Sequence, residues 1–224
     1  GNRDHLIEQM FPISTWGKEF IYVPYRTRIG GDYVKIMAAE DGTTVDISGM
    51  GAPIQLNSGE TRVFKALPDV RKISGNKPLQ IAQLSRSMEC DNVPSDPFMI
   101  MLSPLEQRVK EVTFEAFEVQ EINQYYLTLI SLSTGFADVT LDGVDISGQF
   151  TVEGEGAYAA INITRGTHKL IAPDGVIAYV YGYGPSESFG YSAGVNLSDL
   201  SLVIEGTDPD IGVVNPEACL NSPV

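Results

Sequence analysis

Hydrophobic and polar residues alternate along much of this chain in short runs. In residues 33–39, for example, Val34, Ile36 and Ala38 fall on one side of an extended chain, and the residues between them fall on the other. This two-residue period is typical of a β-strand that buries one face. Similar runs, rich in Val, Ile, Tyr and Phe, predict strands at residues 19–25, 33–39, 43–47, 61–66, 79–84, 112–118, 126–132, 137–141, 158–163, 167–171 and 176–181.

Glycine-containing dipeptides lie between many of these runs. They supply the positive φ angles that tight hairpin turns need, at little steric cost. Only residues 105–112, where Leu105, Val109 and Val112 recur at helical spacing, suggest a short helical piece. The chain is therefore predicted to be all-β and antiparallel, with turns at Gly30-Gly31, Asp41-Gly42, Ser58-Gly59, Asp142-Gly143, Arg165-Gly166 and Asp174-Gly175.

The first half of the chain recurs in the second half in the same order. The offset is 92 residues between Pro12 and Pro104 (104 − 12), and it grows to 96 between Ala82 and Ala178 (178 − 82). The matching positions are mostly strand hydrophobics and turn residues, whereas charged and aromatic side chains mostly differ. A tandem duplication of an antiparallel β-sandwich unit follows, without a duplicated catalytic site.

The boundary between the two predicted units falls near residue 103. Residues 88–97 form a loop by composition, because Pro94 and Pro97 cannot donate to a strand ladder. The apolar run 98–102 comes next, and the second repeat begins at Pro104. We expect a first β-sandwich repeat at 1–103 and a second at 104–198. Residues 199–224 would hold a C-terminal strand, a linker and the start of a following Ig-like or PKD-like module.

Composition and charge narrow the classes of partner. The 224 residues carry a net charge of −14, and the mean hydropathy of −0.02 is that of an ordinary globular protein. An acidic surface repels nucleic-acid phosphates and anionic lipids, although simple solubility explains the charge equally well. The longest apolar run, residues 98–102, is far shorter than the ~20 residues that span a bilayer. Neither nucleic acid nor membrane insertion is expected.

The sequence offers no catalytic or metal constellation. His5 and His168 are the two histidines, and neither has a nearby Cys or second His that would complete a zinc site. His168 lies in a strand-like run, and no Gly-x-Ser-x-Gly elbow is present. We interpret His168 as a hydrogen-bonded strand histidine, and we predict no catalytic residue, no metal site and no cofactor.

Two clusters of acidic residues could in principle bind calcium, which needs several oxygen ligands from one or two loops. Neither cluster follows the spacing of an EF-hand loop, and Asp-Gly in a hairpin turn requires no ion. Turn chemistry is the preferred interpretation of both clusters, Asp138, Asp142 and Asp145 in one and Asp208 and Asp210 in the other.

One pair of carboxylates keeps a hydrolytic alternative open. Glycoside hydrolases use two carboxylates a few Å apart, and Glu153 and Glu155 are a candidate pair. Strand alternation would instead place both side chains on one exposed edge. A concave pocket with two convergent carboxylates of raised pKa would favour the enzyme, and we expect none.

An aromatic, glycine-rich segment near the end of the second repeat supplies the candidate binding residues. Tyr183, Phe189 and Tyr191 alternate there with glycines. Exposed aromatic rings can stack on a sugar or anchor a protein partner, but core strands use the same residues. Binding and core packing both remain open for these three side chains.

The two cysteines, Cys90 and Cys219, also leave two interpretations. Exported proteins seldom keep two cysteines as free thiols, which favours a disulfide that would link the C-terminal tail to the junction of the repeats. Cys219 also resembles the first cysteine of a following module, whose partner would lie downstream. Bridging requires Cα atoms within about 7 Å.

Several short blocks form a recognisable pattern along the chain. The blocks are Trp16-Gly17-Lys18-Glu19-Phe20, Val23-Pro24, 39–45, 56–60, Lys77-Pro78, 96–99, 104–107, 181–184 and 188–191. In this order they resemble the IgG Fc-binding protein N-terminal domain family, and the resemblance covers roughly residues 5–195. It implies an extracellular module of mucus proteins or of large bacterial surface proteins with Ig-like or PKD-like repeats, where members act as binding or adhesion modules without known enzymatic activity.

The resemblance and the missing catalytic constellation together predict a non-catalytic binding or adhesion module of a secreted or cell-surface protein. Its partner would be a host or extracellular glycoprotein or glycan, and the module would be a monomeric unit within a larger multidomain chain. The alternatives are a structural spacer or cap of a longer surface repeat array and, less favoured, the carboxylate-based glycoside hydrolase.

Overall fold

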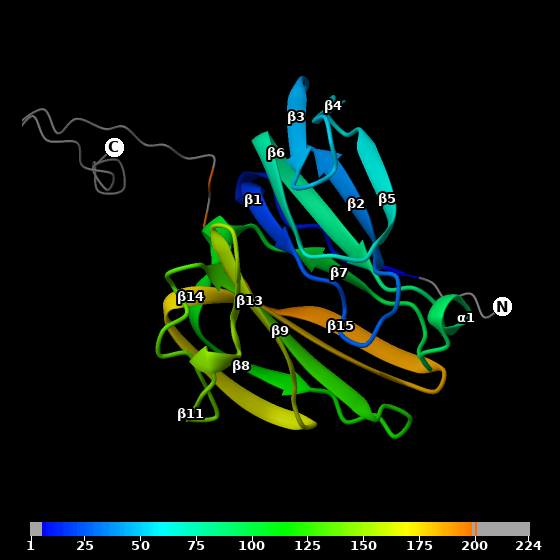
Figure 1. The fold of residues 1–224 in the computed structure, drawn as a ribbon, viewed down its shortest axis with the longest axis vertical. Coiled ribbons are helices and arrows are strands. Elements are labelled where there is room, and N and C mark those ends of the chain that lie inside the picture. Colours follow the sequence, from blue (N-terminus) through cyan, green and yellow to red (C-terminus); the bar gives the residue numbers. More distant parts are fainter. Residues whose placement is uncertain (1–5, 199, 201–224) are drawn as a thin grey trace, which may run out of the picture.

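The computed structural model describes residues 6–198 and 200, and its strands form two antiparallel sheets (Figure 1). The first sheet has seven strands, and its longest, β6 (Arg71–Leu84), pairs with four others. The first half of β6 lies between β1 and β3, and its second half lies between β2 and β7. The other strands are β1 (Gly17–Tyr22), β2 (Asp32–Ala38), β3 (Thr43–Ile47), β4 (Ile54–Leu56), β5 (Thr61–Leu67) and β7 (Met99–Leu102).

The second sheet has eight strands organised around β14 (Gly166–Gly184) in the same way. The first half of β14 lies between β8 and β10, and its second half lies between β9 and β15. The remaining strands are β8 (Val109–Ala116), β9 (Gln124–Leu132), β10 (Thr140–Leu141), β11 (Val144–Asp145), β12 (Thr151–Glu153), β13 (Gly156–Asn162) and β15 (Glu187–Gly194).

The two sheets therefore share one connectivity, which confirms the prediction of an all-β fold with two similar antiparallel units. Strands β1 to β7 correspond in order to β8, β9, β10, β11, β13, β14 and β15. Each unit also opens with a 3-10 turn after a proline, η1 (Ile13–Thr15) after Pro12 and η2 (Leu105–Gln107) after Pro104. The second unit adds β12 and a third turn, η3 (Ser147–Gln149).

Of the strand predicted at 137–141, only Thr140–Leu141 form one, because Asp138 takes a turn conformation with a φ of 56°. Two further local predictions were wrong. The helical spacing at 105–112 produces only η2, because Val109 already pairs with Val176 as part of β8. The expected turn at Asp174-Gly175 is a bulge inside one continuous strand, β14, where the register shifts between Ile171 and Val176. Gly175 takes a φ of 82° there, which lets the extra residues leave the ladder without ending the strand.

Strand pairing also corrects the sequence alignment of the repeats by one residue. Ala82 pairs with Lys35 on β2, and Tyr179 pairs with Thr128, the equivalent position of β9. The structural counterpart of Ala82 is therefore Tyr179 and not Ala178. A one-residue slip matters because it exchanges the two faces of a strand.

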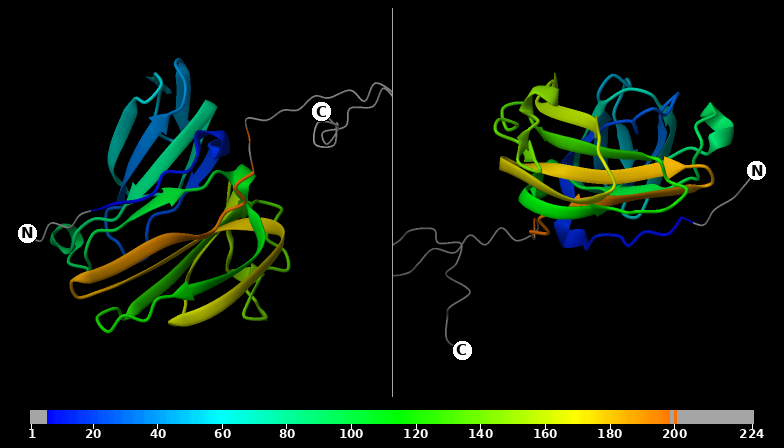
Figure 2. Two further views of the ribbon diagram at one scale, coloured as in Figure 1. Left: turned by 180° about the vertical axis from the view of Figure 1, so that it is seen from behind. Right: turned by 90° about the horizontal axis from the view of Figure 1, so that it is seen from below.

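Two hydrophobic cores hold the sheets. The first core lies between the inner face of the first sheet and one face of β9 and β14. It contains Ile36 and Ile81 of the first sheet together with Tyr126 and Tyr181 of the second. The second core lies inside the curl of the second sheet. Strand β9 and the second half of β14 are thus buried on both faces, as their near-continuous burial shows. The first sheet packs on the second (Figure 2), and the first core contains residues of both units. The domain boundary at residue 103 stays a prediction.

Polar bonds across the junction fix the two units together. The hydroxyl of Tyr181 accepts a hydrogen bond from the Arg26 backbone N–H at 2.9 Å, and Tyr179 accepts one from Ser103 N–H at 2.7 Å. The Arg26 guanidinium donates to the Ala160 carbonyl at 2.5 Å. The loop between β1 and β2 is therefore bonded to the second sheet as well as to its own.

Helices are short in this fold. The α-helix α1 (Met88–Asp91) covers a single turn of the loop after β6, where a proline-containing loop was predicted. Among the described residues, no helix has the length and apolar character needed to cross a membrane.

Candidate functional site

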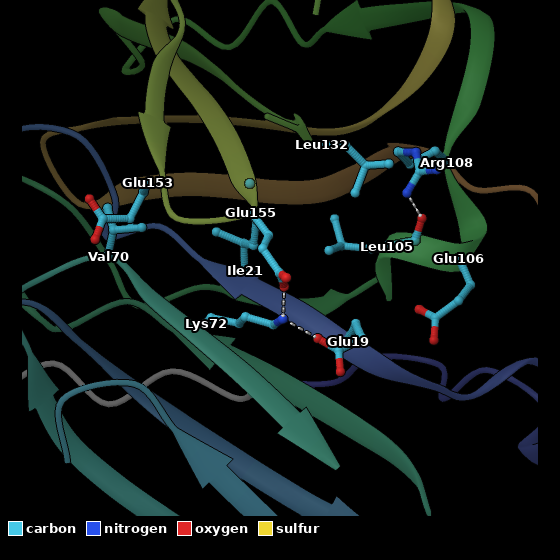
Figure 3. A pocket seen from close by; sticks show the side chains of 11 residues that line it. Glu19, Ile21, Val70, Lys72, Leu105, Glu106, Arg108, Leu132, Glu153 and Glu155 are labelled. Carbon is cyan, nitrogen blue, oxygen red and sulfur yellow. Dashed lines mark hydrogen bonds and ion pairs between the residues drawn. The ribbon is translucent and has the colours of Figure 1, made fainter. Parts of the chain in front are cut away.

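A cleft of about 420 Å³ opens at the junction of the two sheets (Figure 3). Strands β1 and β6 and the turn η2 border it on one side, and the end of β9 with the β12–β13 turn borders it on the other. We call it the junction cleft. Its apolar floor consists of Ile21, Val70, Leu105 and Leu132, and its charged rim consists of Glu19, Lys72, Glu106, Arg108, Glu153 and Glu155.

Lys72 occupies the middle of the rim and links the two sheets. Its Nζ lies 3.0 Å from Glu19 Oε2 on β1 and 2.5 Å from Glu155 Oε2 on the β12–β13 turn. The hydrogen bonds to Glu155 and Glu19 raise the pKa of Lys72, and the bond to Lys72 lowers the pKa of Glu155. Glu155 is therefore ionised at neutral pH, and Glu19 and Glu155 together hold the lysine as a bridge.

The other charged groups of the rim are less engaged. Glu106 Oε1 accepts a hydrogen bond from the Lys18 backbone N–H at 3.0 Å, and the Arg108 guanidinium donates to the Leu105 carbonyl. Within the described part of the chain, the Glu153 carboxylate has no hydrogen-bond or ion-pair partner. Four carboxylates against two cations leave the rim with a net charge of −2 (2 − 4).

The candidate hydrolytic pair, Glu153 and Glu155, lies in this cleft but does not converge. Glu155 turns towards Lys72, whereas the Glu153 carboxylate lies apart from that of Glu155 (Figure 3). A general acid needs a raised pKa, and the pKa of Glu155 is lowered. The geometry therefore favours binding over glycoside hydrolysis.

The three aromatic candidates do not form one surface. Tyr183 is wholly buried in the first core, and its hydroxyl donates to the Arg26 carbonyl, so it presents no face to a ligand. Phe189 and Tyr191 are half-buried against the second core. Their ring centroids lie 5.2 and 5.4 Å from that of Phe117, which is 47% exposed. Phe117 was missed because the packing of β15 against β8, which brings these rings together, joins segments far apart in the sequence.

His168 is the hydrogen-bonded strand histidine that was predicted. It is buried, with Nδ1 2.7 Å from Asp142 Oδ2 and Nε2 2.9 Å from the Thr164 carbonyl oxygen. Burial acts to raise the pKa of Asp142, but hydrogen bonds from Lys169 N–H and His168 outweigh it and lower that pKa. These contacts give His168 a structural role.

The acidic cluster around the β10–β11 hairpin consists of turn residues. Asp142 and Gly143 have φ angles of 53° and 80°, the combination that a two-residue type I′ hairpin requires. Asp145 Oδ1 accepts a bond from Ser147 N–H at 2.8 Å, and Asp138 has a φ of 56°. Asp208 and Asp210 lie outside the described residues.

The predicted disulfide reaches beyond the described part of the chain. Cys90 is exposed on α1, and its thiol lies 3.8 Å from Ser87 Oγ. His5 and Cys219 lie outside the described residues. So does nearly all of the segment 199–224, where a C-terminal strand and the start of a following module were predicted. The Cys90–Cys219 bridge therefore stays a prediction.

Comparison with family models matches residues 1–182 to the IgGFc binding protein family. The chain belongs to the IgGFc binding protein family. Every residue that lines the junction cleft falls within this matched range. No curated protein and no solved structure matches the chain significantly. Membership of the IgGFc binding family implies a non-catalytic binding module.

Proposed function

We propose that this IgGFc-binding domain is a binding or adhesion module of a secreted or cell-surface protein, with an extracellular glycoprotein or glycan as its partner. It would act as a monomeric unit within a larger multidomain chain. Family membership supports the binding role, and the junction cleft is the observation that carries the proposal. A preformed recess with an apolar floor and a few polar groups on its rim is typical of ligand sites.

The position of the junction cleft suggests why two copies of the scaffold would be needed for binding. Each unit supplies part of the recess, so a single copy of the scaffold would lack one wall. The bridge from Glu19 through Lys72 to Glu155 holds the two walls in one geometry. A rigid site reduces the ordering entropy that binding costs.

An array of extracellular glycoproteins and glycans tests the proposal. The probes are the wild-type domain, Leu132→Asp in the cleft floor and Val144→Asp as a control. Val144 is also an exposed apolar strand residue, but it lies on β11 away from the cleft. We expect reproducible hits for the wild type, their loss in Leu132→Asp and their retention in Val144→Asp. Silence of the wild type across the array would contradict the proposal and favour a structural spacer.

A further inference from the structure

We infer that the junction cleft binds a protein segment in which an arginine or lysine is flanked by apolar side chains. This inference rests on the proposed binding function and names the chemistry of the partner. It selects a protein segment over a glycan. Three features of the cleft point to this partner: the charge of its rim, its aliphatic floor and the Glu153 carboxylate, which has no partner among the described residues.

Charge complementarity selects a cation. The rim carries a net charge of −2, and the chain carries −14 as a whole. Such a field attracts a basic segment, and like-charge repulsion disfavours an acidic one. Lys72 does not cancel this preference, because Glu19 and Glu155 already share its charge.

The floor of the cleft selects apolar side chains beside the cation. Ile21, Val70, Leu105 and Leu132 are aliphatic, and Leu132 is 37% exposed. Aliphatic neighbours of the cationic residue, and the methylene stem of that residue, would bury this surface. Among the described lining residues there is no aromatic ring on which a sugar would stack, which disfavours a glycan here.

Glu153 is the carboxylate that would pair with the incoming cation. It is exposed at the end of β12 and has no partner among the described residues. Glu155 follows on the same turn with its side chain 84% exposed. A guanidinium group donates in a planar fork and can take two carboxylate oxygens at once, so arginine should bind more tightly than lysine.

The test is a titration of the isotope-labelled domain followed by NMR. The probe is the capped peptide acetyl-Ser-Leu-Arg-Leu-Ser-amide, and its control carries citrulline, the neutral isostere, in place of arginine. The arginine peptide should shift the amide signals of Ile21, Lys72 and Gly156. We expect the citrulline peptide to bind about fivefold more weakly, and high salt to weaken only the arginine peptide.

Two variants of equal charge complete the experiment. Glu153→Gln removes the unpaired carboxylate without touching the Lys72 bridge, and it should weaken the arginine peptide about threefold or more. Glu121→Gln removes the same charge from an exposed loop outside the cleft, and it should leave binding unchanged.

Three outcomes would overturn the inference: equal shifts with both peptides, no cleft shifts with either, or shifts produced by a mixture of disaccharides and not by the arginine peptide. These outcomes do not depend on the array. If the array gives hits that Glu153→Gln leaves unchanged, the binding function stands and the basic-segment inference falls. A silent array would contradict the proposed glycoprotein or glycan partner, and the peptide titration tests the cleft separately.

Discussion

The two units share a scaffold, but they differ most at one buried position. In the first unit Asp32 is wholly buried, and its Oδ2 accepts bonds from Tyr25 N–H at 2.8 Å, Gln83 Nε2 at 2.9 Å and Tyr22 OH at 3.2 Å. Its other oxygen, Oδ1, has no hydrogen-bond partner among the residues that the structure describes. Burial raises the pKa of Asp32 to about 6, although the hydrogen bonds act to lower it.

The second unit has an apolar group in the same place. The pairing of equivalent strands puts Phe114, Tyr125 and Val180 where the first unit has Tyr22, Asp32 and Gln83. All three lie in the second core, and the Tyr125 hydroxyl donates to the nearby Ile122 carbonyl. The scaffold therefore folds without a buried carboxylate, and the charge is a feature of the first unit alone. The two units thus share their strand register, but they differ in the polarity of these buried side chains.

Arg28→Met should give the largest effect and would show how much the first unit depends on buried charge. Arg28 Nε lies 2.8 Å from Asp91 Oδ2, and both side chains are fully buried. Removing the cation leaves Asp91 buried and uncompensated, which should cost about 3–5 kcal/mol in urea unfolding. The matched control is Arg165→Met, which breaks the exposed Arg165–Glu118 pair of the second unit and should cost less than about 1 kcal/mol. Equal losses in the two variants would contradict this difference.

Asp32→Asn should remove a pH dependence that belongs to the first unit. The folded-state pKa of about 6 lies above the ordinary value of 3.8, so the folded protein holds this proton more tightly. The stabilisation is complete below about pH 4 and is lost as the pH rises through about 6. A difference of about two pH units corresponds to about 3 kcal/mol.

The measurement is urea unfolding of wild type and Asp32→Asn from pH 4 to pH 8. The stability of the wild type minus that of the variant should fall by about 3 kcal/mol across this range, because other carboxylates cancel in the difference. A pH-independent difference would show that Asp32 titrates normally.

Tyr181→Phe should sharpen the comparison at the junction. The variant removes the buried hydroxyl that accepts the Arg26 N–H bond at 2.9 Å, so the N–H loses its partner and stability should fall by about 1–2 kcal/mol. Amide hydrogen exchange at Arg26 should accelerate. Tyr125→Phe removes a hydroxyl bonded only within the second unit, and it should leave exchange at Arg26 unchanged. Unaltered exchange in Tyr181→Phe would refute the cross-junction bond.

Ala66→Gly should give the smallest effect, a gain in stability. Strand β5 has a bulge where its register with β2 shifts, and the exposed Ala66 there has a φ of 58°. A left-handed conformation costs an L-residue about 1–2 kcal/mol, and glycine avoids this cost. Part of the benefit is lost because glycine has a larger conformational entropy in the unfolded state. We therefore expect the free energy of unfolding to rise by about 0.5–1 kcal/mol. Strand β13, the counterpart of β5, pairs with β9 in unbroken register. Ala160→Gly on β13 should therefore destabilise the protein in the same unfolding assay.

The sequence by itself determined the fold class and the duplication. Two-residue patterning and glycine turns are local signals that identify strands and hairpins. The collinear matches from Pro12 to Ala178 correctly predicted that the two sheets share one connectivity. The errors came where pairing overrode a local signal. Asp174-Gly175 looks like a turn, yet β8 and β9 hold both flanks of the bulge in one strand, β14.

Only the tertiary structure decided the site. The lining of the junction cleft runs from Glu19 to Gly156, and the sequence singled out only Glu153 and Glu155, as an acidic pair on one edge. Their actual surroundings, Lys72 from the first sheet and the apolar floor, come from strands far apart in the chain. When a strand is buried on both faces, the sequence does not tell which face packs into which core. Tyr183 is an example, because only the structure places it in the first core. Patterning records that a side chain is buried, and the packing of one sheet against another determines what it is buried against.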